Sequence, residues 1–415
     1  MTVLALAAVH RRVPPAAGAC LLSFAAFWLA QRAADVSMID LLVYRAEGAT
    51  VRAGGDLYAL RTTEARLPTT YPPFAALLFT PLTLLDTADM RTLATLGNLL
   101  LLIALVRLSL RLTGLPAHGR NVLWVSAAAV WCEPVWTTLR YGQINLLLAV
   151  LVLWDLTRRP GSTGQRWAGV GIGVAAAVKL TPALFVVFLL LTGAAEALRR
   201  GTWRPAVRHA CVAVAAFLCA TLLAAAVLPY DSRRFWTRMV FEAGRVGLAE
   251  DTANQSLRGV LARLLHTGDP GAWWAVTAAL VAVAGLGAAV AAALRGERAW
   301  AALSCAATAL LVSPVSWSHH WVWCVPLVLL LGAQALRRGG RARWAAAGAA
   351  SLAFCSYALW WVPHGEGRLE LAQNYGQMTL SALYVVTACA FLLASIVRSR
   401  SAWTALTRWR TSRTS

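Results

Sequence analysis

The sequence is poor in charged residues and nearly devoid of lysine. Only 13% of its 415 residues are Asp, Glu, Lys or Arg, whereas soluble domains carry about a quarter. Lys179 is the only lysine, and the eight cysteines form no CxxC pair. These shortages exclude a soluble domain of ordinary composition and a disordered chain, and they predict neither a disulfide framework nor a cysteine-based metal site.

Motifs for nucleotides and metals are also missing. The chain has no Walker motif, no GxGxxG followed by an acidic residue, and no zinc-type spacing of His and Cys. These absences disfavour a nucleotide-driven pump. We therefore expect no cofactor and assign no metal ligand.

Apolar residues, by contrast, make up 59% of the chain. At about 20 residues per crossing, this predicts an all-α polytopic membrane protein with about twelve transmembrane helices. The expected spans are residues 15–34, 92–113, 121–138, 143–157, 166–180, 182–198, 205–228, 272–294, 299–313, 320–336, 343–362 and 375–397. A further apolar stretch at 74–85 is too short for a comfortable crossing and contains Pro81, so we expect a re-entrant or interfacial helix there.

The net charge of +20 comes from arginines that alternate with the apolar stretches instead of forming one patch. This distribution does not indicate a nucleic-acid partner. If 74–85 does not cross, most short basic loops fall on one side of the membrane, which the positive-inside rule makes cytoplasmic. We therefore expect a cytoplasmic N-terminus (1–14), a single transmembrane domain (15–397) and a basic cytoplasmic tail (398–415). Residues 35–91 and 229–271 become the two large external segments.

With this topology, the polar clusters that packing does not explain all fall on the external side. They lie at Asp40, 71–73, 140–145, 179–182, 254–257, 313–320 and 364–366. None of them was needed to set the topology. Their convergence predicts one site at the outer boundary of a cell-membrane protein.

Asp40 follows the first span and is the main candidate for acid–base chemistry. A carboxylate at the mouth of an apolar bundle is partly desolvated, which favours a raised pKa and a role as general base. Alternatively, Asp40 caps a helix that runs to about Arg52. Asp35 is the rival carboxylate, but it lies closer to the first span.

Lys179 stands between two short apolar segments, just before Thr181 and Pro182. A cation there needs an anionic partner or an aqueous cavity, so a buried phosphate site is favoured. Alternatively, Lys179 snorkels to the membrane interface.

His319 and His320 begin a predicted span. Adjacent residues of a helix point to different faces, so this pair alone does not predict a metal site. Contact with phosphate or proton transfer by one histidine is one interpretation. The other is interfacial packing beside Trp317, Trp321 and Trp323.

The amides of Gln143, Asn145, Asn254 and Gln255 donate and accept hydrogen bonds without charge, which suits hydroxyl-rich ligands. Helix capping is the alternative for each of them. The nineteen tryptophans fit both an interfacial belt and stacking on sugars.

Seven segments, in this order, resemble the signature of glycosyltransferase family 87, part of the GT-C superfamily of polyprenyl-phosphate-sugar enzymes. They are 40–45 (DLLVYR), 55–58 (GDLY), 70–77 (TYPPFAAL), 142–145 (GQIN), 178–182 (VKLTP), 254–257 (NQSL) and 313–320 (SPVSWSHH). The resemblance covers roughly residues 35–325 and extends to the actinobacterial α-1,2-mannosyltransferases of phosphatidylinositol mannoside and lipomannan synthesis.

The resemblance implies a GT-C fold with amphipathic helices in the first external loop. It also implies inverting transfer of a sugar, with mannose expected, from a polyprenyl-phosphate donor to a glycolipid acceptor in cell-envelope synthesis, through an α-1,2 linkage. A polytopic secondary transporter or flippase for a lipid-linked sugar is the alternative function.

The family's catalytic aspartate carries over onto Asp40, as base for the acceptor hydroxyl, and its Ser-Pro…His-His segment places His319 and His320 near the donor phosphate. We add Lys179 and Arg140 as phosphate partners by our own inference. The residues expected to bind sugar or acceptor are Tyr44, Tyr71, Gln143, Asn145, Asn254, Gln255 and Trp317.

Overall fold

The computed structural model describes residues 13–158, 163–200 and 205–411, and helices dominate them. The two strands, β1 (Arg61–Thr62) and β2 (Leu67–Pro68), form one short antiparallel pair in which Arg61 faces Pro68. The expected all-α class is confirmed. Residues 1–12 of the predicted N-terminal segment and 412–415 of the predicted tail lie outside the described residues.

The described residues form two compact units. The first comprises the described parts of Met1–Leu180, Ala213–Val246 and His319–Ser356. Its elements, besides the two strands, are α2 (Val13–Ala33), α3 (Ile39–Arg52), α4 (Pro73–Phe79), η1 (Thr80–Leu84), α5 (Thr87–Thr113), α6 (Gly119–Ala129), α7 (Glu133–Tyr141), α8 (Asn145–Leu156), η2 (Thr163–Trp167), α9 (Val170–Val178), α12 (Pro229–Thr237), η3 (Met239–Phe241), η4 (Ala243–Val246), η5 (Ser318–Trp323), α16 (Cys324–Arg338) and α17 (Arg341–Cys355).

The second unit comprises the described parts of Thr181–Val212, Gly247–Ser318 and Tyr357–Ser415. Its elements are α10 (Ala183–Arg200), α13 (Leu257–Leu264), α14 (Gly271–Leu294), α15 (Arg298–Val312), η6 (Ala358–Trp360), η7 (Leu369–Ala372), α18 (Tyr375–Ser381) and α19 (Leu383–Thr411). Helix α11 (Pro205–Val227) contributes residues to both units.

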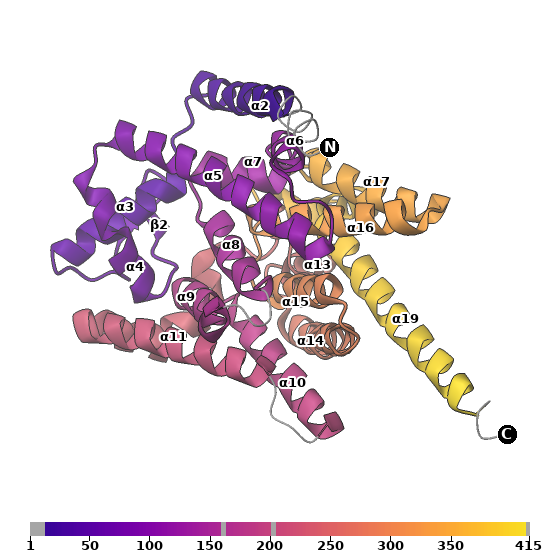
Figure 1. Ribbon diagram of the computed structural model, residues 1–415. Coiled ribbons are helices and arrows are strands. Elements are labelled where there is room, and N and C mark those ends of the chain that lie inside the picture. The colour runs from indigo at the N-terminus through magenta and orange to yellow at the C-terminus, as the bar shows by residue number, and fades with distance from the viewer. Residues whose placement is uncertain (1–12, 159–162, 201–204, 412–415) are drawn as a thin grey trace. The chain divides into compact units, whose positions relative to one another are not determined.

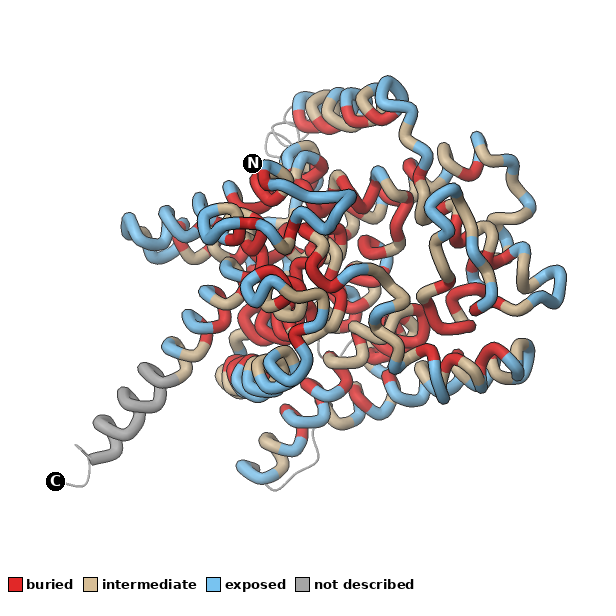
Figure 2. The backbone as a smooth tube through the Cα atoms, turned by 180° about the vertical axis from the view of Figure 1, so that it is seen from behind, coloured by how far each residue is buried: buried red, intermediate tan, exposed pale blue. Residues whose placement is uncertain are grey.

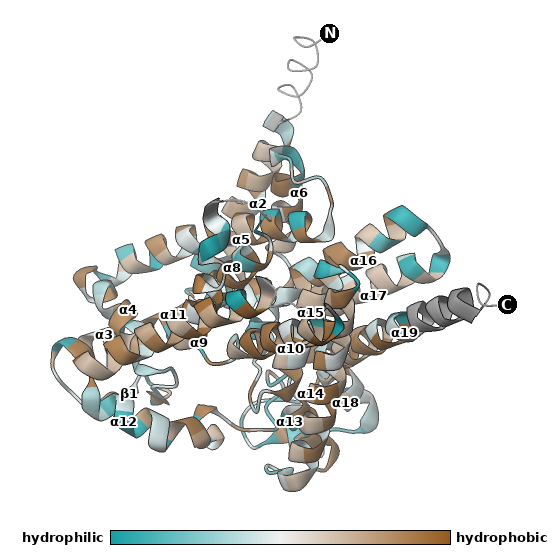
Figure 3. Ribbon diagram, turned by 60° about the horizontal axis from the view of Figure 1, so that its bottom comes forward, coloured by the Kyte–Doolittle hydropathy of each residue, from teal (hydrophilic) through white to brown (hydrophobic). Residues whose placement is uncertain are grey.

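Five stretches of helix are long and apolar enough to cross a membrane: Pro14–Ala33, Thr87–Thr113, Ala206–Val227, Gly271–Leu294 and Ser318–Arg338. The apolar character of α11 and α14 is visible as brown ribbon in Figure 3. The expected spans at 143–157, 166–180, 299–313 and 343–362 correspond to the shorter helices α8, α9, α15 and α17. The membrane architecture is therefore confirmed, while the number of about twelve crossings stays a prediction.

Two of the expected spans are not continuous helices. The span predicted at 121–138 is α6 and α7, bent by 79°, and the span at 375–397 is α18 and α19, bent by 71°. Pro134 lies in the first turn of α7, where a proline starts a new helix more readily than it continues an old one. The bend matters because α7 leads into the candidate site.

Many apolar side chains on the long helices are exposed. On α2, Leu21 and Leu22 have exposed fractions of 69% and 73%, and in Figure 2 buried and exposed positions alternate along several helices. Exposed apolar surface of this extent is what lipid tails cover in a membrane protein.

Residues 35–91, the predicted first external segment, contain helices α3, α4 and η1, with α3 close to α4 (Figure 1). The stretch predicted at 74–85 is helical over Pro73–Leu84, with a proline at the first position of α4 and again at Pro81 in η1. It is too short to cross a bilayer as a helix, as expected.

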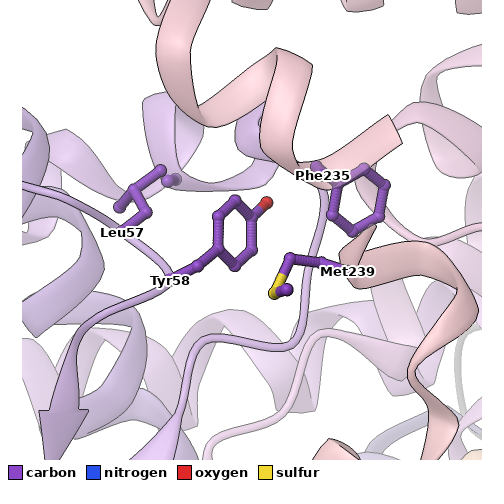
Figure 4. Packing of buried hydrophobic residues seen from close by; sticks show 5 residues of the cluster. Leu57, Tyr58, Phe235 and Met239 are labelled. Atoms are coloured by element: carbon purple, nitrogen blue, oxygen red, sulfur yellow. The ribbon is translucent and has the colours of Figure 1, made fainter. Parts of the chain in front are cut away.

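A buried cluster joins the segment between α3 and α4 to α12 (Figure 4). Leu57 and Tyr58 pack with Ala76 of α4, Phe235 of α12 and Met239 of η3. The rings of Tyr58 and Phe235 are stacked with centroids 5.8 Å apart. The cluster thereby anchors the loop that follows α3.

Arg245 fixes the backbone just before Tyr71. Its guanidinium donates to the carbonyl oxygens of Thr69 and Thr70 at 2.5 and 3.0 Å. The chain then enters α4 directly after Tyr71 and Pro72, so the position of the Tyr71 side chain is determined from both sides.

Candidate active site

Asp40 lies in the first turn of α3 but does not cap it. The N-cap position is Met38, which has a left-handed backbone (φ 53°), and no side chain caps the helix. The Asp40 carboxylate instead accepts a hydrogen bond from Gln143 Nε2, at 2.7 Å from Oδ2. The capping interpretation of Asp40 is therefore wrong, because its carboxylate bonds to Gln143 and not to the backbone of α3.

The surroundings of Asp40 suit a general base. Burial raises the pKa of Asp40, while the hydrogen bond from Gln143 and the nearby charge of Lys179 act in the opposite direction. A carboxylate whose pKa is raised binds a proton more strongly once it is ionised, which suits a general base. Asp35, the rival carboxylate, is exposed in the turn after α2.

Tyr44, Tyr71 and Gln143 form a buried network behind Asp40. The two tyrosine hydroxyl oxygens lie 2.9 Å apart, and they stand 2.7 and 3.1 Å from Gln143 Oε1. Burial raises the pKa of both Tyr44 and Tyr71, so each hydroxyl keeps its proton and donates. The Gln143 oxygen thus faces hydroxyl donors, and its NH₂ group faces the carboxylate.

The three-residue link between α7 and α8 brings Gln143 to Asp40. Gly142 ends α7 with a left-handed backbone (φ +69°), and a Cβ atom there would lie only 2.7 Å from the Cβ of Leu41. Glycine therefore serves twice, since it permits the turn and allows the close approach of α3.

Asn145, at the start of α8, reaches the other side of the site. Its Nδ2 donates to the carbonyl oxygen of His319 at 3.0 Å, and its Oδ1 accepts from Lys179 Nζ at 3.3 Å. Thr138 of α7 donates to the same His319 carbonyl at 2.8 Å. These contacts fix the backbone of the two histidines to α7 and α8.

Lys179 follows the last residue of α9 in an extended conformation. Its Nζ lies 2.8 Å from Nε2 of His320 and 5.3 Å from the ring centroid of Tyr71. The start of α9 is held by Asp155, which accepts from the backbone N–H of Ile172 at 2.9 Å. Lys179 is thus placed by a short, anchored helix and bonded to neutral groups.

The two histidines have different surroundings, as expected. Their rings are nearly perpendicular, with centroids 4.8 Å apart. His319 is 5% exposed, and its Nε2 has no hydrogen-bond partner in the described part of the chain. His320 is the histidine that contacts Lys179.

The first unit therefore brings together most of the residues expected in the site: Asp40, Tyr44, Tyr71, Gln143, Asn145, Lys179, His319 and His320. Arg140 belongs to the same unit, but its side chain is exposed at the end of α7. Among the residues that the structure describes, no group of three or more His, Cys, Asp or Glu side chains is placed to hold a metal ion.

Asn254 belongs to the second unit, where its amide is engaged in internal bonds rather than open to a ligand. It is fully buried, donates to the carbonyl of Ala249 at 2.9 Å and accepts from the N–H of Ser316 at 3.0 Å. It also forms an isolated β-bridge with Trp317. These bonds engage its amide within the second unit, and the sugar contact expected for Asn254 stays a prediction.

The amide of Gln255 is also engaged within the second unit. It is fully buried, and its Nε2 donates to the carbonyls of Thr252 and Ser381 at 2.8 and 2.6 Å. Its Oε1 accepts from the N–H of Tyr384 at 3.3 Å. The whole amide is engaged in joining separate segments of the second unit.

Sequence reasoning missed Glu47, which is completely buried on α3. Asp40, Tyr44 and Glu47 follow one another at i, i+4 and i+7, the spacing that places side chains on one helix face. That spacing was the available signal. Thr138 was also missed, and nothing in the sequence distinguishes it from the neighbouring Thr137.

The chain matches the family model "Glycosyltransferase family 87" over residues 70–314. It is 37% identical over 304 residues to the polyprenol-phosphate-mannose-dependent alpha-(1-2)-phosphatidylinositol pentamannoside mannosyltransferase of Mycobacterium tuberculosis, covering 71% of this chain and 66% of that protein. It is also 37% identical over 286 residues to the phosphatidylinositol mannoside mannosyltransferase of the same species, covering 66% and 64%. The match thus spans slightly less than two thirds of the length of these two relatives.

The corresponding pentamannoside mannosyltransferase of Mycolicibacterium smegmatis is 34% identical over 315 residues, covering 74% of this chain and 72% of that protein. A solved structure, ArnT from Cupriavidus metallidurans bound to undecaprenyl phosphate, aligns over 91% of this chain and 77% of its own, with a TM-score of 0.44 and 14% identity. The match to the family model covers more than half of the sequence and includes Tyr71, Gln143, Asn145 and Lys179. The chain therefore belongs to glycosyltransferase family 87.

Proposed function

We propose that this protein is a membrane glycosyltransferase that moves mannose from a polyprenyl-phosphate donor to a lipid-linked mannosyl acceptor, forming an α-1,2 linkage. The names of the similar mycobacterial proteins support the donor, the sugar and the acceptor class. One observation carries the chemical part of the proposal. Gln143 and Asn145, two residues apart, bond to Asp40 and Lys179 respectively, so one short link joins a carboxylate to a cation.

Asp40 acts as the general base. Its Oδ2 is engaged by Gln143, and its Oδ1 has no hydrogen bond within the described ranges, so Oδ1 takes the proton of the acceptor hydroxyl. The acceptor oxygen then attacks the anomeric carbon as the bond to the phosphate oxygen breaks. A single displacement of this kind inverts a β-linked donor into an α-linked product.

Lys179 and His320 stabilise the leaving phosphate. An ammonium group has three N–H donors, of which one points to Asn145 and one to His320. The third is available to a phosphate oxygen of the leaving group. Charge stabilisation by fixed donors is a large contribution to catalysis in a site with little water.

The site faces the external side of the membrane, and both termini are cytoplasmic. The distribution of arginines over the short loops supports this orientation. A lipid-linked phosphosugar arrives laterally through the bilayer and needs no nucleotide pocket, which agrees with the absence of nucleotide motifs.

Purified full-length protein in lipid nanodiscs, incubated with radiolabelled polyprenyl-phosphate mannose and phosphatidylinositol mannosides, tests the proposal. We expect a product heavier by one hexose with an α-1,2 bond. Asp40→Asn should keep donor binding but lower the transfer rate by about a hundredfold or more. The matched variant Asp35→Asn, in the exposed turn, should stay within about twofold of the wild type.

Full transfer by Asp40→Asn would exclude Asp40 as the base. Movement of intact donor across sealed vesicles, with no hexose transferred to any acceptor, would instead support a flippase. A cysteine-labelling result that places position 40 on the cytoplasmic side would contradict the proposed orientation.

A further inference from the structure

Helix α3 presents two carboxylates to the interior, and they differ in their hydrogen bonds. Asp40 accepts from Gln143. Neither carboxyl oxygen of Glu47 forms a hydrogen bond of good geometry in the described part of the chain, although the nearby Thr69 hydroxyl, as a hydrogen-bonding group, and the charge of Arg245 both lower its pKa. Tyr44 lies between the two along the helix.

The orientation of the Gln143 amide follows from its neighbours. Each tyrosine hydroxyl has one proton, so at least one is donated to Gln143 Oε1 and the other goes either there or to its partner hydroxyl. A flipped amide would point its oxygen at the Asp40 carboxylate, which can only accept. The tyrosines and the carboxylate thus select the same orientation.

Packing limits other arrangements of this network. The Tyr44 ring is stacked on Phe79 at 4.2 Å and meets the Tyr71 ring edge-on at 5.4 Å. Tyr44, Tyr71 and Gln143 are 1%, 7% and 5% exposed. Their polar groups are already bonded to one another, which leaves little capacity for the sugar contact expected from the sequence.

We propose that Gln143, with its amide oriented by Tyr44 and Tyr71, is a positioning residue that gives the base role to Asp40 rather than Glu47 and directs Oδ1 to the acceptor hydroxyl. This inference rests on the proposed function and reassigns the three residues from substrate contact to positioning. Gln143 acts by holding one carboxylate oxygen and by favouring the ionised form of Asp40.

The charged and titratable groups around the network are few. Lys179 faces Asp40 from the end of α9, and Glu47 and Tyr44 face it from α3 itself. Tyr71 approaches from the segment before α4, and Arg245 lies beside Glu47. Among the described hydrogen bonds, Asp40 accepts one, from Gln143. Removal of the Gln143 side chain should therefore have the most direct effect on the pKa of Asp40.

The pH dependence of sugar transfer distinguishes a positioning role of Gln143 from a purely structural role, because only the positioning role changes the pKa of Asp40. The hydrogen bond from Gln143 lowers the pKa of Asp40, and its loss raises that pKa. Because the base works only when ionised, the acid limb of kcat moves to higher pH in Gln143→Leu. A hydrogen bond to a charged group predicts a shift of roughly one pH unit, and therefore a fall in kcat of up to about tenfold on the acid side of that limb. The KM for donor stays within about twofold.

A double-mutant cycle tests whether the tyrosines act through Gln143. Tyr44→Phe should lower kcat in the wild-type background and have no further effect in Gln143→Leu, because its partner is already gone. Gln143→Met, of nearly the same shape, should repeat the effects of Gln143→Leu and serves if that variant is unstable. Tyr375→Phe, at an exposed tyrosine, is the control.

An unchanged acid limb in both Gln143 variants would overturn the proposal. Equal effects of Tyr44→Phe in the two backgrounds would also overturn it and would favour direct contact between Tyr44 and substrate. The variant Asp40→Asn tests the base role of Asp40 separately from the positioning role of Gln143. If that variant still transfers sugar, the proposed base is wrong. If it is inactive and the Gln143 profiles are unchanged, only the positioning role fails.

Discussion

Lys179 Nζ lies 2.8 Å from Nε2 of His320. When Lys179 is protonated its ammonium group can only donate, so Nε2 accepts and the imidazole proton of His320 resides on Nδ1. The pair joins the end of α9 to η5, two segments 141 residues apart in sequence. This contact underlies the assignment of both residues to the leaving phosphate.

Two substitutions of Lys179 should show how much its charge and its shape each contribute to the transfer rate. We expect Lys179→Met to lower kcat by about a hundredfold to a thousandfold, because the leaving phosphate loses a fixed cation. Lys179→Arg keeps the charge but not the compact ammonium geometry, so an intermediate rate is expected. Steady-state rates with labelled donor measure both variants.

Arg140→Gln is the comparison for Lys179→Met. The sequence predicted Arg140 as a second phosphate partner, but its side chain is exposed at the end of α7, so we expect it to contribute little to phosphate binding. Its rate should remain within about threefold of the wild type. A normal rate in Lys179→Met, or an equal loss in Arg140→Gln, would contradict the assigned phosphate partner.

The buried Glu47 should make stability depend on pH. Burial raises the pKa of Glu47 to about 8, whereas an exposed glutamate titrates near about 4.3. Between these values the folded protein holds a proton that the unfolded chain has lost, so stability falls as pH rises through this window. Glu47→Gln removes that decline. The difference between its thermal midpoint and that of the wild type should therefore be more positive at pH 8 than at pH 5.

Thermal unfolding of detergent-solubilised protein at several pH values measures this effect. Glu64→Gln, at an exposed glutamate, should follow the wild type throughout. Sugar transfer by Glu47→Gln should remain within about threefold, because a neutral amide resembles the protonated acid. A pH-independent gap between Glu47→Gln and wild type would argue against a buried, protonated Glu47.

Asn254 should affect stability and not substrate binding. Asn254→Leu leaves the carbonyl of Ala249 and the N–H of Ser316 without their partner, which predicts a loss of about 1–3 kcal/mol in the free energy of unfolding. The KM for donor and acceptor in the folded fraction should be unchanged. A large rise in KM at unchanged stability would restore Asn254 as a sugar ligand.

Substitution by alanine should have opposite effects on stability at two helical glycines. A Cβ at Gly48 of α3 would lie 2.6 Å from the carbonyl oxygen of Phe79, so Gly48→Ala should cost about 1–3 kcal/mol through overpacking. Transfer should slow as well, because α3 carries Asp40. Gly18 of α2 has no atom within 4 Å of such a Cβ, and Gly18→Ala should be neutral or stabilising by up to about 1 kcal/mol. Thermal midpoints compare the two, and equal behaviour would mean that α3 and α4 are not in close contact.

Several elements could be predicted because their signals are local. The expected helix from Asp40 to about Arg52 is α3, and the short apolar stretch at 74–85 is α4 with η1. The break between α6 and α7 was not predicted, although Pro134 offered a signal, since an apolar run over 121–138 dominates any window that includes it. Hydropathy reports the length of an apolar run but not the direction of the chain within it.

The amides illustrate the limit of sequence reasoning for the site. Gln143 and Asn145 reach Asp40 and Lys179, whereas Asn254 and Gln255 are bonded to backbone groups of the second unit. All four are buried amides in short polar motifs. No local property separates them, because the partners of an amide depend on which remote segments come within about 3 Å of it.

The sequence by itself determined the class of the protein, an all-α membrane chain, and the order of motifs that resembles family 87, because composition and motif order are properties of the chain alone. Only the tertiary structure decided that Asp40 bonds to Gln143 instead of capping α3, that Lys179 meets His320, and that Glu47 is completely buried. These relationships join residues far apart in sequence or depend on burial, and hydrogen bonding and desolvation act only over the few ångströms that folding brings about.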